Sequence, residues 1–594
     1  MRKGGAAFLR DDGSFGPAGS GPALCHPRPF FYTPIALSHA LILSYMAMQP
    51  ASFSPRCNRL SHGAPIPFFW LSLACAQSPV VDLGYTSYEG RSLRNGVSQW
   101  LGLRFAAPPV GDLRFAAPRD PVAQQGVQKA NHHGFLCIPV AKSLDAPIPR
   151  LTSEDCLFLD VYAPTRAMRS NSKLPVYFFI QGGGFAELSN ANYNGSGLVE
   201  ASGHNIVVVT FNYRVGPYGF LAGEEVEKGG SLNNGLKDQI KALQWVQKHI
   251  SKFGGDPNHV VIGGDSAGGA SVTLLLSAYG GRNDNLFIGA AAESQSFGTM
   301  LNISESQFSY DNLVSRTGCA GTADTLSCLR SLDITTLQHK NIKTPLPGGT
   351  NNPLYLYSPT IDGDLVQDHT LSLFRAGKFI KVPVIFGDDT DEGTIFVPKN
   401  TSTLSAADTF LKDQFPSLTP THLSKINSLY LTPSQTKTYP GAAPYWPPTS
   451  KAYGELRYIC PGVEMSRVFA SAGQKSWNYH FAVQDPHHDA IGEGTTHTVE
   501  VNAIWGPEYV SGEAPASYYT INKGIVPAMQ GYWTSFVRAL DPNTFRAPGA
   551  PEWETWGEER RIFIRTNETR METVPTAQGE RCEYLLSIGV ELRQ

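Results

Sequence analysis

The sequence has little charge of either sign, and it contains no dense run of Lys or Arg. Charged residues make up only 17% of the chain, and the net charge is −3. Proteins that bind nucleic acids usually present a clustered basic surface to the phosphates. We therefore expect no nucleic-acid partner, and a neutral small molecule suits this composition better as a substrate.

The chain also lacks internal repeats, low-complexity tracts and any convincing break in composition after its first 76 residues. These absences exclude repeat architectures and fibrous or largely disordered proteins. With 41% hydrophobic residues, the chain can bury a large core. We expect residues 77–594 to form a single globular domain.

Long apolar stretches are confined to the N-terminal segment. The stretch Pro65–Ala76 follows basic residues and ends in small residues, which is typical of a secretory signal peptide cut after Ala76. A removed leader of residues 1–76 would leave Gln77 at the mature N-terminus. Because a signal peptide begins near the initiating Met, we expect translation to start at Met46 or Met48.

A second apolar stretch, Phe30–Met48, gives the alternative of a membrane anchor. It is interrupted by Pro34, Ser38 and His39, and polar residues are costly inside a bilayer. A secreted protein without stable membrane insertion is therefore favoured over an anchored one.

Cysteine is scarce, and three of the nine cysteines fall in the leader. An even number remains, which fits an oxidising compartment but does not fix the pairing: Cys137, Cys156, Cys319, Cys328, Cys460 and Cys582. Four N-glycosylation triplets agree with secretion: Asn194, Asn302, Asn400 and Asn567.

Short apolar runs, bounded by Gly, Pro or Asp, alternate with helical patterns along the mature chain. Four runs rich in β-branched and aromatic residues are expected as buried strands: 176–180, 206–211, 259–262 and 382–386. Residues 235–250 carry apolar residues at helical spacing. This alternation predicts an α/β fold with a large, mostly parallel central sheet flanked by helices. The Pro- and Tyr-rich segment 434–450 is expected to be a surface excursion.

Residues 264–268 read GDSAG and match the G-x-S-x-G motif. An expected strand precedes them and a helical pattern follows, so the chain must turn sharply at Ser266. Small flanking residues permit such a turn, which leaves the serine hydroxyl exposed above the sheet. This context favours Ser266 as a nucleophile over an ordinary Gly-rich turn.

A serine nucleophile needs a base, and the base needs an acid that orients it; with this motif both follow the serine in the chain. The segment 388–392 holds four carboxylates directly after an expected strand, and the residues alone do not separate Asp391 from Glu392. Among the later histidines, His497 is best placed, in the loop after the expected strand 476–483. The adjacent His487 and His488 point in different directions, so no metal site is expected there.

Three glycines follow the expected strand 176–180, in the sequence QGGGF at 181–185. This run resembles the loop whose backbone N–H groups bind the oxyanion in esterases and lipases. We expect Gly183 and Gly184 to supply two donors, and Ala267, directly after the serine, to supply the third.

Taken together, these motifs resemble those of the type-B carboxylesterase and lipase family of α/β-hydrolases. The resemblance covers nearly all of the mature chain, and further segments carry it: WLGLRFAAPPVG at 100–111, SEDCL at 153–157, FNYR at 211–214 and FGGDP at 253–257. It implies a serine carboxylic ester hydrolase that needs no cofactor. The alternatives are a non-catalytic, cholinesterase-like binding protein, and a pathway-specific esterase or lactonase with the same residues.

The resemblance also implies roles and pairings that the residues alone leave open. It makes Glu392 the acid and His497 the base. It implies the disulfides Cys137–Cys156, Cys319–Cys328 and Cys460–Cys582, and the ion pairs Arg114–Glu154 and Arg214–Asp238. Two positions depart from the family's common pattern, because Asp265 replaces a Glu and Gln181 replaces a His or Tyr.

The segment between Cys137 and Cys156, which forms the lid in lipases of the resembled family, is short and contains no aromatic residue. A short lid predicts an esterase without strong interfacial activation. Choline esters are not expected as substrates, because the segment has no Trp to hold a quaternary ammonium group.

Overall fold

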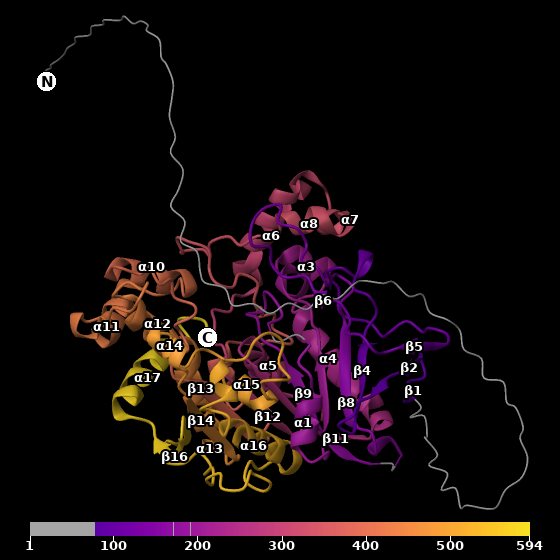
Figure 1. The fold of residues 1–594 in the computed structure, drawn as a ribbon. Coiled ribbons are helices and arrows are strands. Elements are labelled where there is room, and N and C mark those ends of the chain that lie inside the picture. Colours follow the sequence, from indigo (N-terminus) through magenta and orange to yellow (C-terminus); the bar gives the residue numbers. More distant parts are fainter. Residues whose placement is uncertain (1–77, 170–171, 190–191) are drawn as a thin grey trace, which may run out of the picture. The chain divides into compact units, whose positions relative to one another are not determined.

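The computed structural model describes residues 78–169, 172–189 and 192–594 (Figure 1). The expected leader, residues 1–76, and the expected mature N-terminus at Gln77 lie outside the described residues. Within the described part of the chain, no helix combines the length and the apolar character needed to cross a bilayer.

The described residues form a central sheet of eleven strands. From one edge to the other, these are β16 (Glu568–Thr573), β15 (Arg560–Arg565), β14 (Ser476–Ala482), β13 (Val384–Asp389), β12 (Gly289–Glu293), β11 (Gly255–Asp265), β9 (Leu174–Ile180), β10 (Val207–Phe211), β8 (Phe158–Pro164), β4 (Val97–Arg104) and β3 (Arg91–Ser92). In this spatial order, the strands from β15 through β9 to β10 pair in parallel. The pairs at both edges are antiparallel. The predicted α/β fold with a mostly parallel sheet is confirmed.

Alternate residues of the central strands enter two different cores, one on each face of the sheet. In β9, Val176, Phe178 and Ile180 belong to the first core, and Tyr177 and Phe179 belong to the second. The first core is covered by α4 (Asn234–His249), α5 (Ala267–Gly281) and α13 (Cys460–Ser471). The second is covered by α1 (Ser196–Ala201), α15 (Val501–Trp505) and α16 (Ile525–Ala539). Burial on both faces explains why these strands read as unbroken apolar runs.

The remaining helices lie around these layers, and several of them add buried residues to the first core. They are α2 (Gly216–Phe220), α3 (Glu224–Gly229), α6 (Ile303–Thr317), α7 (Thr325–Ser331), α8 (Ile334–Lys340), α9 (Thr370–Arg375), α10 (Leu404–Gln414), α11 (Pro420–Tyr430), α12 (Trp446–Gly454), α14 (Pro486–Ala490) and α17 (Thr576–Ile588). A π-helical turn, η6 (Glu455–Ile459), joins α12 to α13. There are also two small sheets in the described residues: β1 (Val80–Asp82), β2 (Ser87–Glu89) and β5 (Val127–Lys129) form one, and β6 (Leu136–Cys137) and β7 (Thr152–Ser153) form the other.

The segment 434–450 differs from its expectation as a surface excursion. Helix α12 begins at Trp446, whose indole is fully buried and donates a hydrogen bond to the carbonyl of Thr394 at 3.2 Å. The two prolines that follow Trp446 fit the first turn of a helix, where no N–H partner is needed. The prolines of this segment therefore belong partly to a loop and partly to the first turn of α12.

Three disulfides join the pairs that the family resemblance implied: Cys137–Cys156, Cys319–Cys328 and Cys460–Cys582. Cys460–Cys582 spans 122 positions and ties the start of α13 to α17. The other two close shorter segments, with separations of 19 and 9 positions. Such cross-links stabilise a fold mainly by restricting the unfolded chain.

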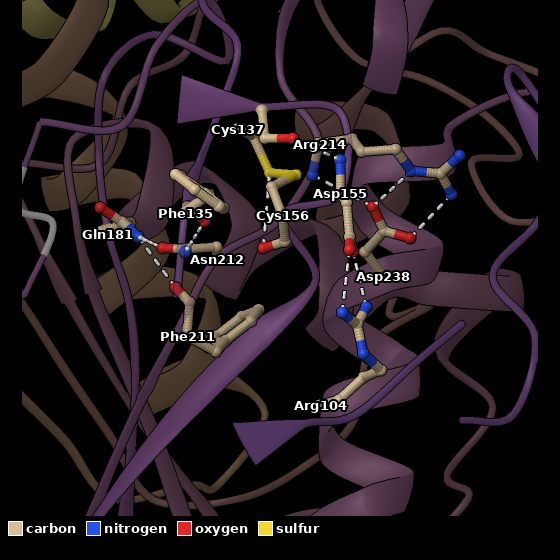
Figure 2. The surroundings of a disulfide bond; sticks show 11 residues. Arg104, Phe135, Cys137, Asp155, Cys156, Gln181, Phe211, Asn212, Arg214 and Asp238 are labelled. Carbon is tan, nitrogen blue, oxygen red and sulfur yellow. Dashed lines mark hydrogen bonds and ion pairs between the residues drawn. A yellow bond between two sulfur atoms is a disulfide. The ribbon is translucent and has the colours of Figure 1, made fainter. Parts of the chain in front are cut away.

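The two implied ion pairs are also present, and both are bidentate. Arg114 donates from Nε and Nη2 to Glu154 at 2.6 and 2.7 Å. Arg214 donates from Nε and Nη2 to Asp238 at 2.8 Å each, and from Nη1 to the carbonyl of Ala116 at 2.7 Å (Figure 2). Arg214 follows β10 and Asp238 lies on α4, so this pair fixes that loop to the helix below it.

The Arg214–Asp238 pair gives a first prediction about stability. Asp238→Asn should lower the free energy of unfolding by about 3–5 kcal/mol, because it leaves the guanidinium of a buried arginine without its counter-ion. The measurement is the urea midpoint of the disulfide-intact protein. The exposed pair Lys228–Glu224 supplies the control, since Lys228→Ala should leave the midpoint unchanged. Equal midpoints for the two variants would contradict a supporting role for Asp238.

Candidate active site

Ser266 lies at the sharp turn between β11 and α5. Its backbone is strained, with φ of 55° and ψ of −117°. The turn presses against the end of β9: a Cβ at Gly264 would lie 2.6 Å from the carbonyl oxygen of Ile180, and a Cβ at Gly268 would overlap that same oxygen. Both glycines of the motif are therefore required by close backbone approach. The turn holds the Ser266 side chain at the carboxyl ends of the parallel strands.

His497 contacts Ser266 directly, although 231 positions separate them in the sequence. Its Nε2 lies 2.8 Å from the Ser266 hydroxyl oxygen, within reach for proton transfer. His497 comes from the loop between α14 and α15, and both side chains are buried. The rings of Tyr458 and Phe396 pack against the imidazole, with centroids 4.4 and 5.0 Å away.

Of the four carboxylates at 388–392, Glu392 is the one that contacts His497, through a short hydrogen bond from the imidazole Nδ1. The other three are occupied elsewhere. Asp388 accepts from the Gln295 side chain at 2.9 Å, and Asp391 accepts from the backbone N–H of Thr495 at 2.9 Å. Asp389 is fully buried and faces Glu500. The structure therefore distinguishes Asp391 from Glu392, which the residues alone did not.

Burial acts on the two ionisable groups in opposite directions. It lowers the pKa of His497 and raises the pKa of Glu392, because each charged form loses hydration. Hydrogen bonds to Glu392 from the Ser294 hydroxyl and the Asp389 N–H, both at 2.7 Å, oppose the rise of its pKa. The imidazole is thus neutral at neutral pH, the form in which it can accept a proton.

The three-glycine loop passes beside Ser266. A Cβ at Gly182 would lie 2.9 Å from that of Ser266. Gly183 and Gly184 have φ of 114° and 61°, and side chains there would overlap the carbonyl of Glu187 and the ring of Tyr355. Within the described residues, the N–H groups of Gly183, Gly184 and Ala267 donate to no backbone carbonyl. They remain available to an oxygen bound beside Ser266.

The two positions that depart from the family's common pattern both support this loop. Asp265 accepts a hydrogen bond from the N–H of Gly182 at 3.0 Å. The Gln181 side chain is buried and donates to the carbonyl of Phe211 at 2.8 Å and to the Asn212 side chain at 3.2 Å (Figure 2). Asn212 in turn donates to the carbonyl of Phe135, close to the Cys137–Cys156 disulfide. Gln181 thus anchors the loop to the end of β10.

Two further residues next to Glu392, Ser294 and Glu500, were not predicted from the sequence. Ser294, directly after β12, donates to Glu392 and lies 3.4 Å from a carboxylate oxygen of Glu500. Glu500 is fully buried and accepts a hydrogen bond from the Tyr479 hydroxyl at 2.7 Å. The signal for Ser294 was its place at the end of a parallel strand. Glu500, on the N-terminal side of α15, gave no such signal.

Comparison with known proteins identifies the family to which this chain belongs. A sequence model of the carboxylesterase family matches residues 77–585. The chain belongs to the carboxylesterase family. This carboxylesterase is 32% identical over 515 residues to Secreted lipase 4 of Gibberella zeae, covering 82% of the chain and 90% of that protein. It is 29% identical over 563 residues to Lipase 1 of Geotrichum candidum, covering 85% and 96%.

Among solved structures, Aspergillus niger EstA superposes on this carboxylesterase with a TM-score of 0.83 and 45% sequence identity. The match covers 87% of this chain and 99% of that one. The α/β-hydrolase fold and the family resemblance predicted from the sequence are confirmed. The chain is a carboxylic ester hydrolase, and this function is supported over that of a non-catalytic binding protein.

The glycine loop gives a prediction about activity. Gly184→Ala should lower kcat by at least about 100-fold, because the new methyl group overlaps Tyr355 and displaces an oxyanion donor. Gly441 is the matched control: its φ of 73° is equally positive, but no atom lies within 4 Å of its added Cβ. Gly441→Ala should carry the same backbone strain and keep its activity. Equal kcat values for the two folded variants would exclude a role for the Gly184 position.

Proposed function

We propose that this carboxylesterase cleaves small carboxylic esters through an acyl intermediate on Ser266. The observation that carries the proposal is the continuous hydrogen-bonded chain from Ser266 through His497 to Glu392. In this proposal His497 removes the hydroxyl proton as Ser266 attacks the ester carbonyl, and Glu392 stabilises the imidazolium that forms.

The same residues then complete the cycle. The carbonyl oxygen becomes an oxyanion and accepts hydrogen bonds from the N–H groups of Gly183, Gly184 and Ala267. His497 returns its proton to the leaving alcohol, which breaks the ester bond. A water molecule, deprotonated by His497, then attacks the acyl-Ser266 ester, and the carboxylic acid product leaves as Ser266 regains its proton.

A labelling experiment tests the nucleophile. A fluorophosphonate should label the wild-type protein but not Ser266→Ala, and kcat for p-nitrophenyl butyrate should fall by about 10⁴-fold or more in that variant. Ser277 supplies the control, because it is a buried serine of α5 whose hydroxyl bonds only to helix carbonyls. Ser277→Ala should be labelled normally. Labelling that survives Ser266→Ala would place the nucleophile elsewhere.

An esterase rather than an interfacially activated lipase is supported by how the short lid segment is held. Between Cys137 and Cys156, the N–H of Val140 donates to the carbonyl of Ala186 at 2.9 Å. The N–H groups of Ala141 and Asp145 donate to Asn341 and His339, at 2.9 and 3.1 Å. A segment tied in this way to the oxyanion loop and to the end of α8 has little freedom to open at a lipid surface.

We therefore expect hydrolysis rates to rise smoothly with substrate concentration through the critical micelle concentration. The measurement is the initial rate for p-nitrophenyl esters from acetate to palmitate, below and above that point. A sharp jump in rate when micelles form would contradict a fixed lid segment. The same series gives the preferred acyl length.

We further propose that the protein is secreted after cleavage of its leader. The three disulfides fit an oxidising compartment, and three of the four glycosylation asparagines, Asn302, Asn400 and Asn567, are exposed. Three relatives also carry the word secreted in their names. N-terminal sequencing of the protein from culture medium should begin at Gln77. A cell-bound protein with residues upstream of Gln77 would contradict this proposal.

A further inference from the structure

A buried positive charge lies beside the candidate active site and has no counter-ion among the residues that the structure describes. The side chain of Arg457 belongs to a residue that is only 7% exposed. Within the described residues, no Asp or Glu forms an ion pair with it. Buried charges in proteins are normally paired, because an isolated ion loses its hydration without compensation. Arg214, which is also buried, follows this rule through Asp238.

The fold holds Arg457 in place through the π-helical turn η6. Such a turn leaves backbone carbonyls without their usual helical partners, and here three groups from outside the helix satisfy them. The carbonyl of Arg457 accepts from the N–H of Phe297 at 2.8 Å, and that of Tyr458 accepts from the Gln295 side chain at 3.0 Å. The carbonyl of Leu456 accepts from the Gln594 side chain at 3.0 Å. Single π turns inside helices often occur at functional sites.

This turn connects Arg457 to the nucleophile. The Arg457 Nε donates to the hydroxyl of Ser296 at 2.8 Å, and the N–H of Ser296 donates to the carbonyl of Ser266 at 3.2 Å. The next residue, Tyr458, packs on the ring of His497. Arg457 therefore does not contact Ser266 or His497 itself, but one residue, Ser296 or Tyr458, links it to each of them.

Aromatic rings surround the guanidinium but do not neutralise it. The rings of Tyr355, Tyr458 and Tyr453 lie 5.3, 5.8 and 5.9 Å from the Arg457 Cζ. Each such contact is weaker than an ion pair with a carboxylate. Tyr355 also packs against Gly184 of the oxyanion loop, so this aromatic set continues to the site itself.

Space and hydroxyl groups are present next to the charge. Two cavities, each with a volume of about 30 Å³, share Arg457 and Gly298 in their walls, together with the hydroxyl-bearing residues Thr299 and Ser358. A Cβ at Gly298 would lie 2.8 Å from the Arg457 Nη2, so the absence of a side chain there leaves room beside the guanidinium. Cavities of this volume accept a group of only a few atoms.

We propose that Arg457 binds a carboxylate carried by the ester substrate, so that the enzyme prefers hemiesters of short dicarboxylic acids to neutral esters of the same size. The inference rests on the proposed function of Ser266. The planar guanidinium can hold a carboxylate with two parallel hydrogen bonds, and burial strengthens that contact. The bound substrate would supply the counter-ion that is missing from the described part of the chain.

The test compares an anionic ester with a neutral ester of nearly the same shape. Monoethyl succinate and ethyl levulinate differ in having a carboxylate or a methyl ketone at the same position. The wild-type enzyme should have the higher kcat/KM for monoethyl succinate. Arg457→Met should lower that value about 100-fold more than the value for ethyl levulinate, because the buried carboxylate loses its charged partner. Arg457→Lys keeps the charge without the planar fork and should restore part of the preference.

A matched control is Arg538→Met, which removes another arginine that packs over an aromatic ring, on the distant helix α16. It should leave the ratio of the two kcat/KM values unchanged. Equal losses for both esters in Arg457→Met would show that Arg457 only supports the fold, and would overturn the proposal. A wild-type enzyme without preference for the anionic ester would overturn it as well.

A second pair of esters locates the carboxylate within the substrate. In 3-acetoxypropanoate and 4-acetoxy-2-butanone the anionic and neutral groups lie on the alcohol side. A preference that depends on Arg457 in the first ester pair supports recognition of the acyl part as proposed. The same preference in this pair alone would overturn the assignment to dicarboxylic hemiesters. Failure to hydrolyse any ester, neutral or anionic, would refute the Ser266 mechanism instead.

Discussion

The geometry of the site depends on one close contact between backbones, where the turn that carries Ser266 meets the end of β9. Gly264 and Gly268 both lie against the carbonyl of Ile180, and the chain beyond Ile180 becomes the glycine loop. One contact therefore fixes Ser266 relative to the expected oxyanion donors. The strained φ of Ser266 is the energetic cost of this arrangement, about 1–3 kcal/mol for such conformations. The buried sheet on either side keeps the turn from relaxing.

Buried charged side chains are paired in the supporting parts of the fold, but not all of those near the site have a partner of opposite charge among the described residues. Arg114 and Arg214 have bidentate carboxylate partners and hold loops to helices. Around the site, Glu392, Asp389 and Glu500 are buried, and burial raises the pKa of each carboxyl group; repulsion between neighbouring carboxylates raises the pKa of Asp389 and Glu500 further. Arg457, whose neighbour Tyr458 packs on the ring of His497, has no carboxylate partner among the described residues, so the charge around the site is unevenly distributed. Such an uneven distribution of charge fits the proposed site, in which a negatively charged substrate supplies the partner of Arg457.

Much of the fold and the central residues of the site could be predicted from local sequence patterns. The buried strands, the helix over 235–250 and the turn at Ser266 each have a signal within a few residues. Strand ends were less accurate: β11 extends from Gly255 to Asp265, well beyond the expected 259–262, because its length is set by pairing with β9 and β12. The choice of Glu392 required the family resemblance. Ser294, Glu500 and Arg457 reach the site through tertiary contacts, and no local pattern distinguishes them.

The contact between Gln594 and the π turn has a consequence for how the protein is made. Its side chain bonds to the carbonyls of Phe297 and Leu456, and the Cys460–Cys582 disulfide fastens the same region. This wall of the site therefore needs residues synthesised more than three hundred positions after Ser266. During translation, the side of Ser266 next to this wall therefore lacks these contacts until the distant segment has been synthesised. Contacts between residues so far apart in the chain form late and slow folding.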